Sequence, residues 1–239
     1  MSHPRINLHT HTLYSDGDFT VDEVACRARR DGLTHLAITD HFETSKLIDP
    51  LRRVDLAAYL RDIRTAGERH AGHLEVLAGV EIDTNPQRCD LYELPFDLLN
   101  QMDLVLFEYV EDPLYGGVPL NELRHLVREL QVPFGLCYWD MERIFPRREP
   151  EWLADKLALL GAFVEVPTSF HYKRDGRFLY EHSERFYRAF EGRVRVSIGT
   201  DMHHSLSEVG NIGHGLRFVR DTGLCGELLF NDNGRALGI

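Results

Sequence analysis

The chain has 239 residues, of which 43% are hydrophobic and 27% are charged, and its formal net charge is −11. These values are typical of a globular protein with one large domain or two small ones. The acidic balance disfavours long nucleic acid as a partner, because proteins that bind it usually carry an excess of lysine and arginine.

Four cysteines, Cys26, Cys89, Cys137 and Cys225, are scattered along the chain without a CxxC pair. This spacing favours reduced thiols over a zinc ribbon or a disulfide framework. The first residues lack the apolar core of a signal peptide, and no apolar run reaches the length of a membrane span. We therefore expect a cytoplasmic protein that does not enter a membrane.

Strands and helices are expected to alternate along the chain. The opening stretch alternates Ile6 and Leu8 with Asn7 and His9, the pattern of a strand with one buried face. Thr20 and Glu23 form a capping box for the helix that follows. Further strands are expected at 33–39, 74–82, 103–110, 133–139, 162–166 and 194–199. Helices are expected at 21–30, 55–70, 120–131, 149–160, 180–191 and 208–222.

Seven strand–helix units with nearly continuously apolar strands indicate a parallel sheet covered by helices. No linker divides them, so residues 1–239 are expected to form a single domain. Polar residues follow the first, second, third and seventh strands. They can share one site in a closed barrel, whose strand ends surround one mouth, but not along the edge of an open sheet. We therefore predict an α/β fold, a distorted seven-stranded (β/α)7 TIM-like barrel.

The polar residues at these strand ends are of the types that bind metal ions. His9 and His11 project together because side chains two apart in a strand share a face. Each residue alone has an ordinary structural explanation, such as a helix cap or a salt bridge. Their recurrence at the same position of several units favours a metal centre. Mixed histidine and carboxylate ligands suit zinc, manganese or iron better than magnesium or calcium.

The stretches HTHTLYSDG, ITDH, GVEI and SIGTDMH resemble, in this order, the four motifs of the PHP (polymerase and histidinol phosphatase) superfamily. The resemblance implies a distorted barrel with two or three metal ions at its mouth and hydrolysis of phosphate esters. The expected ligands of one ion are His9, His11, Glu81 and Asp201, and those of a second are Asp16, His41 and His203. Asp40 is expected to act from behind the ligands, where a carboxylate orients an imidazole.

Two departures from the family pattern concern the remaining ion. The family has a histidine after the fourth strand, where this chain reads LFEYVE over 106–111, and a His-Pro pair after the fifth, where it reads CYWD over 137–140. Glu108, Glu111 or Asp140 are candidate replacement ligands, but Tyr138 and Trp139 would fill much of that space. We therefore expect two ions rather than three.

The resemblance implies that a metal-activated hydroxide attacks the phosphorus of a small phosphorylated metabolite or nucleotide. His203, His204 or His171 is a candidate to protonate the leaving group, although His204 is better explained as a surface residue. Arg143 and Lys173 are candidates to hold phosphate, and each is equally well explained as a surface charge.

The alternative is a barrel that has lost catalysis and binds metal together with a phosphorylated ligand or a partner. A third possibility is an enzyme that catalyses a different reaction, because amide hydrolases and nucleases use the same ligand types. The oligomeric state is not indicated by the sequence.

Overall fold

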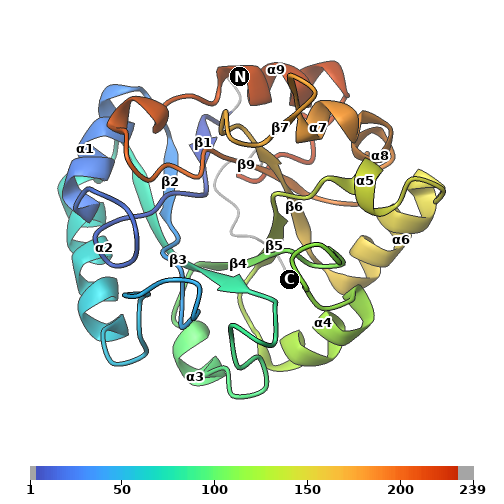
Figure 1. Ribbon diagram of the computed structural model, residues 1–239. Helices are drawn as coiled ribbons and strands as arrows, with labels where there is room; N and C mark the ends of the chain where they lie inside the picture. Colours follow the sequence, from blue (N-terminus) through green and yellow to red (C-terminus); the bar gives the residue numbers. More distant parts are fainter. Residues whose placement is uncertain (1–3, 231–239) are drawn as a thin grey trace.

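The computed structural model describes residues 4–230, in which seven parallel strands form a barrel. Figure 1 looks along the barrel, with the strands inside and the helices around them. The strands follow the chain in the order β1 (Ile6–Asn7), β2 (His35–Ile38), β3 (Glu75–Asp83), β4 (Leu104–Glu108), β5 (Phe134–Cys137), β6 (Phe163–Pro167) and β9 (Val196–Gly199). A separate antiparallel pair consists of β7 (Lys173–Arg174) and β8 (Arg177–Phe178).

Backbone hydrogen bonds close the barrel between its first and last strands. The Leu8 N–H donates to the Ile198 carbonyl at 2.8 Å, and the Asp201 N–H donates to the His9 carbonyl at 2.9 Å. The predicted (β/α)7 barrel is therefore confirmed. This contact between the first and last strands, the closing seam, lies next to the motifs HTHTLYSDG and SIGTDMH near the two ends of the sequence.

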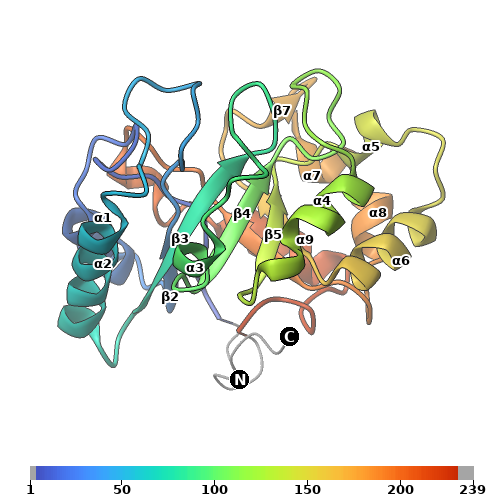
Figure 2. The same cartoon turned by 90° about the horizontal axis from the view of Figure 1, so that it is seen from below.

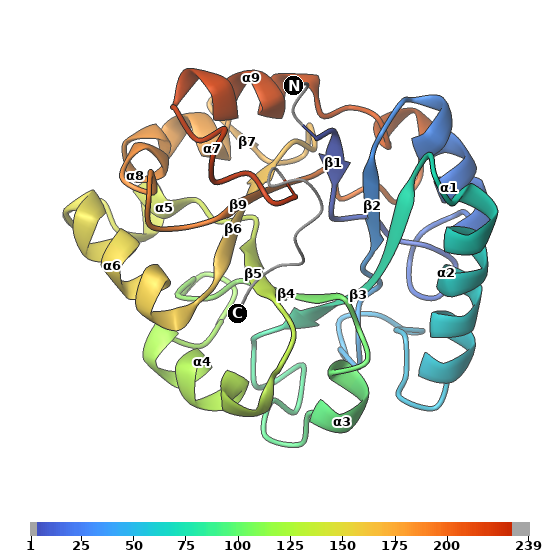
Figure 3. The ribbon, with the colours of Figure 1, turned by 180° about the vertical axis from the view of Figure 1, so that it is seen from behind.

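The helices lie on the outside of the barrel, as Figure 3 shows from the opposite end. They are α1 (Val21–Arg30), α2 (Leu56–His70), α3 (Phe96–Leu99), α4 (Leu120–Leu126), α5 (Met141–Ile144), α6 (Pro150–Leu160), α7 (Leu179–His182), α8 (Glu184–Arg188) and α9 (Gly213–Asp221), with 3-10 turns at Val127–Glu129 and Leu206–Glu208. The expected capping box of Thr20 and Glu23 is confirmed at the start of α1. Among the helices of residues 4–230, none combines the length and apolar character that crossing a bilayer requires.

Two expectations about individual elements are wrong. Ile6, Asn7, Leu8 and His9 are all fully buried, so the opening strand has no solvent face. A barrel strand is covered on one side by the helices and on the other by the barrel interior, and polar side chains inside must then be paired. The expected last helix also starts late, because α9 begins only at Gly213.

The carboxyl ends of the strands gather at one end of the barrel, and the long connecting loops rise above them, as the side view of Figure 2 shows. Barrel enzymes place their chemistry at this end, where loops from several strands meet. The predicted ligands lie here.

Candidate metal centre

The closing seam brings the two ends of the sequence into contact. The loop after β1 carries His9 and His11, and the loop after β9 carries Asp201 and His203. The Nε2 atom of His11 lies 3.1 Å from Asp201 Oδ1, and the rings of His11 and His203 stack with centroids 4.0 Å apart. Side chains separated by about 190 residues in the sequence therefore face one another.

His9, His11, Glu81 and Asp201 form the first group of buried ligand atoms. The Nε2 atoms of His9 and His11 lie 3.5 and 3.4 Å from Glu81 Oε2, and 3.4 and 3.1 Å from Asp201 Oδ1. A tetrahedral ion with bonds of roughly 2.1 Å separates its ligands by roughly 3.4 Å. The spacing of this group therefore fits one ion.

His11, Asp16, His41 and His203 form the second group. Asp16 lies between the imidazoles, 3.7 Å from His41 Nε2 and 3.3 Å from His203 Nε2. A neutral imidazole has a single lone pair for a metal. Because His11 directs Nε2 into the first group, the second retains Asp16, His41 and His203, the division that the family resemblance implies.

Asp40 organises the loop that carries Asp16. Its carboxylate accepts hydrogen bonds from the Thr12 N–H at 2.8 Å, the Thr12 hydroxyl at 2.7 Å and the Ser15 hydroxyl at 2.6 Å. Gly17 closes this loop, and a Cβ there would lie 2.5 Å from the His11 carbonyl oxygen. Asp40 thus positions the loop that carries Asp16 by accepting hydrogen bonds from hydroxyl and amide groups. Among these contacts none is to an imidazole, so the expected role of Asp40 in orienting a histidine ring has no support from hydrogen bonding.

Sequence reasoning missed Glu165, which lies on β6 and holds His9. The Glu165 Oε2 atom is 2.7 Å from His9 Nδ1, and both side chains are buried. Gly199 allows this approach, since a Cβ at that position would lie 2.2 Å from the same oxygen. A carboxylate in the otherwise apolar stretch FVEVP was the available signal.

The pKa values in the centre show how strongly these groups depend on one another. Burial lowers the pKa of His9, but the carboxylates of Glu165 and Glu81 raise it well above its usual value. Burial likewise opposes protonation of His203, yet its hydrogen bond to Asp16 raises its pKa to about 9. Burial and the neighbouring imidazoles lower the pKa of His11 to about 3. Protons on some imidazoles therefore balance the carboxylates when no cation is present.

The donor set fits divalent metal ions. Glu81 Oε2 is buried and accepts no hydrogen bond, although imidazole nitrogens of His9, His11 and His41 lie within 3.5 Å of it. His11 Nδ1 is also buried without a hydrogen-bond partner. Buried polar atoms are rarely left unpaired, and a shared cation satisfies several of them at once.

Tyr138 points into the centre, whereas Trp139 does not. The Tyr138 hydroxyl lies 2.8 Å from His9 Nε2 and donates to Asp201 Oδ1 at 2.9 Å, and Tyr172 donates to Asp201 Oδ2 at 2.6 Å. Trp139 donates its indole N–H to the Val110 carbonyl and packs in the core, so the expectation that it fills the site is wrong. Tyr138 and Asp201 both have left-handed backbones, with φ of 55° and 51°, a strain that persists mostly at functional sites.

Of the three candidate replacement ligands, only Glu108 reaches the centre. Its Oε1 lies 3.9 Å from His41 Nδ1, and it accepts a hydrogen bond from Lys46. Glu111 accepts the Leu120 N–H at 2.9 Å, and Asp140 caps α5 and pairs with Arg174. Glu111 and Asp140 therefore stabilise the loops and helix ends around them and do not contact the ligand groups.

The two candidate phosphate-binding residues border a cavity of about 330 Å³ beside the centre. Arg143 lines it with 34% of its side chain exposed, and it pairs with Asp112 and Asp140. Lys173 lies over the Phe178 ring at 4.3 Å. The tyrosines 109, 115, 138 and 172 and His171 also line this cavity.

His204 is 70% exposed and its Nδ1 atom lies 3.2 Å from Asp18 Oδ2, so it points away from the two groups.

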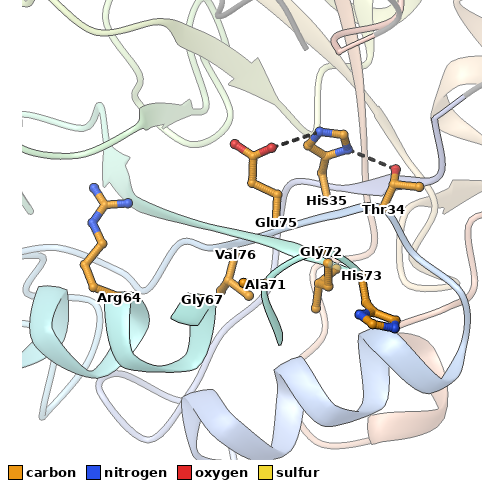
Figure 4. A pocket seen from close by; sticks show the side chains of 10 residues that line it. Thr34, His35, Arg64, Gly67, Ala71, Gly72, His73, Glu75 and Val76 are labelled. Carbon is orange, nitrogen blue, oxygen red and sulfur yellow. Dashed lines mark hydrogen bonds and ion pairs between the residues drawn. The ribbon is translucent and has the colours of Figure 1, made fainter. Parts of the chain in front are cut away.

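A second cavity, drawn in Figure 4, lies at the other end of the barrel between the starts of β2 and β3. It contains a His–Glu pair of its own, His35 and Glu75, at 3.3 Å. Its lining residues belong to none of the ligand groups among residues 4–230.

A family model described as PHP domain matches residues 7–135 of this chain. A curated protein described as "Probable phosphatase", from Syntrophotalea carbinolica, is 27% identical over 237 residues, which cover 95% of this chain and 91% of that protein. The DNA polymerase/3'-5' exonuclease PolX of Bacillus subtilis is 31% identical over 100 residues, which cover 42% of this chain and only 17% of the polymerase.

Among solved structures, a histidinol phosphate phosphatase from Lactococcus lactis, complexed with zinc, L-histidinol and phosphate, matches with a TM-score of 0.66. The two sequences are 14% identical, and the match covers 93% of this chain and 95% of that one. At this level of identity the likeness concerns the fold.

Proposed function

This chain belongs to the PHP family, and from that premise we propose that it hydrolyses a phosphate ester of a small metabolite or nucleotide with the help of two divalent metal ions. The family model covers more than half of the chain, and the match to the "Probable phosphatase" from Syntrophotalea carbinolica runs along nearly all of it. The zinc and phosphate bound by the Lactococcus lactis phosphatase support the same reaction class.

The convergence of the seven ligand-type side chains carries this proposal. His9, His11, Glu81 and Asp201 would hold one ion, and Asp16, His41 and His203 the other. When bound, such ions lower the pKa of a coordinated water toward neutrality and offset negative charge on a phosphoryl group. Zinc, manganese and iron suit this mixture of imidazole and carboxylate.

The residues around the ions have distinct tasks. Glu165 orients the His9 ring, and Asp40 fixes the loop that carries Asp16. Arg143 borders the cavity beside the centre and is the candidate to bind a phosphoryl oxygen. His203, partly exposed at the edge of the centre, is the candidate to pass a proton to the leaving group if it is released from its ion.

The neighbouring cavity supports a small substrate. Its volume of about 330 Å³ is at the lower end of the range for small-molecule sites. The rings of Tyr138 and Tyr172 stack with centroids 4.4 Å apart and form one wall. A compact phosphorylated molecule fits such a space, whereas a folded macromolecule does not enter it.

The test uses protein stripped with a chelator and reloaded with manganese or zinc. We expect metal-dependent release of phosphate from p-nitrophenyl phosphate and from at least one member of a panel of nucleoside monophosphates, sugar phosphates and histidinol phosphate. Asp201→Ala should lose this activity, and His125→Asn, a change at an exposed position on α4, should keep it. Bound metal with no turnover across the panel would instead favour a barrel that binds without catalysis.

A further inference from the structure

A third group of ligand-type side chains lies beside the two already described, formed by His41, Glu81 and Glu108. Glu81 and Glu108 are both fully buried, and Glu108 Oε2 has no hydrogen-bond partner. Two carboxylates this close repel in a medium of low dielectric constant. A positive charge beside the group therefore stabilises both carboxylates in their ionised form.

The positive charge at this position is the ammonium group of Lys46. It donates a hydrogen bond to Glu108 Oε1, and only 18% of the Lys46 side chain is exposed. Burial lowers the pKa of Lys46, but the charges of Glu108 and Glu81 outweigh it and raise the pKa above its usual value. The ammonium group of Lys46 therefore pairs directly with a buried carboxylate of the third group.

The loop after β2 holds Lys46 in place. The neighbouring Ser45 N–H donates to the Arg88 carbonyl at 2.8 Å, and the Thr44 hydroxyl accepts from the Lys46 N–H at 3.2 Å. The Lys46 ammonium also lies 5.4 Å from the centre of the Tyr109 ring, within reach of a cation–π contact. These contacts restrict the position of the Lys46 ammonium group more than the contacts of an exposed lysine would.

His41 is not free to be a ligand of a third ion in this group. It directs Nε2 toward Asp16 in the second group and Nδ1 toward Glu81 at 2.7 Å. Because a neutral imidazole offers one lone pair, His41 cannot serve the second and third groups together. Only the carboxylates of Glu81 and Glu108 remain there as ligands, and the ammonium group of Lys46 already pairs with Glu108.

We propose that Lys46 is a built-in cation of the centre, which takes the position of a third ion beside Glu108 and limits the protein to two divalent ions. The proposal rests on the metal centre inferred above. What is new is that the side chain of Lys46 determines how many ions the centre binds.

The test counts bound manganese by equilibrium dialysis followed by elemental analysis, because manganese accepts carboxylate ligands readily. We expect two ions in the unchanged protein and three in Lys46→Ala, which frees Glu108. Lys46→Arg keeps the charge and should bind two. Lys46→Ala combined with Glu108→Gln removes the freed ligand and should return the number to two.

The outcomes separate this proposal from the function it rests on. Two ions in both the unchanged protein and folded Lys46→Ala would overturn the role of Lys46 alone, as would three ions in the unchanged protein. No bound ion in the unchanged protein would overturn the metal centre itself. If Lys46→Ala does not fold, Lys46→Ser, which keeps a small polar group in the loop, gives the same comparison.

Discussion

The Glu165 Oε2 atom lies 2.7 Å from His9 Nδ1 inside the barrel, and this contact directs the opposite nitrogen of His9 at Asp201 and Glu81. The pair joins β6 to the first loop across the barrel interior. A carboxylate behind a histidine ligand fixes the ring and raises its basicity.

Glu165→Gln keeps the shape of this side chain and removes its charge. We expect metal affinity to fall by about 10- to 100-fold, the usual effect of losing such a partner. Titration against a chelating dye measures it. Glu75→Gln is the matched control, because Glu75 pairs with His35 at the opposite end of the barrel (Figure 4). Equal losses in the two variants would show that the effect is not specific to the centre.

Metal affinity should rise with pH up to about 9. Although burial opposes protonation of His203, its hydrogen bond to Asp16 raises its pKa to about 9 in the metal-free protein. Below that pH the ion must displace a proton from the His203 ring, and above it no proton is displaced from His203. Each displaced proton changes affinity about tenfold per pH unit.

Dye titrations from pH 6 to pH 10 test this dependence. His203→Asn should flatten the profile below about pH 9, where the ion must displace a proton from His203 in the unchanged protein. His204→Asn, at the neighbouring exposed position, should leave the profile as it is. An unchanged profile in His203→Asn would remove His203 from the ligands.

Tyr138→Phe should bind metal more tightly than the unchanged protein. The Tyr138 hydroxyl contacts His9 Nε2 and Asp201 Oδ1, the atoms that face the first ion. One hydrogen bond contributes about 0.5–1.5 kcal/mol, so its removal should increase affinity by about tenfold or less.

Tyr172→Phe is the control for this change, because the Tyr172 hydroxyl donates to the other oxygen of Asp201, Oδ2. Isothermal titration calorimetry should find a smaller effect there. Weaker binding in Tyr138→Phe would mean that the phenol supports the ion instead of competing with it.

Metal should stabilise the fold, because the ligands come from both ends of the chain and bind an ion together only when folded. At an ion concentration of 100 times Kd, the gain is about 2.7 kcal/mol. For a chain of this size each kcal/mol raises Tm by about 2–4 °C. Thermal unfolding with and without a chelator measures the shift, which His9→Ala and Asp201→Ala should each reduce, because each removes a ligand of the first ion. A full shift in either variant would show that the ion binds elsewhere.

The barrel could be predicted because it follows from local patterns, and the resemblance to the family motifs indicated the seven ligand-type positions. Apolar strands alternate with helices, and a barrel gathers the ends of its strands at one mouth. Glu165 and Lys46 could not be placed this way. Glu165 meets His9 only across the closed barrel, and Lys46 reaches Glu108 from an irregular loop.

The adjacent aromatic residues Tyr138 and Trp139 illustrate a second limit. Their size and their position after the fifth strand indicated that both would fill much of the space left by the missing histidines. The left-handed backbone of Tyr138, with φ of 55°, directs one ring into the centre and the other into the core. Sequence patterns do not predict such a local reversal of the chain.

Anomalous diffraction from crystals loaded with manganese or zinc, measured at the absorption edge of the metal, tests the central claim most directly. We predict one peak among His9, His11, Glu81 and Asp201 and a second among Asp16, His41 and His203. Peaks confined to other parts of the molecule, or none at either position in fully loaded crystals, would contradict the account.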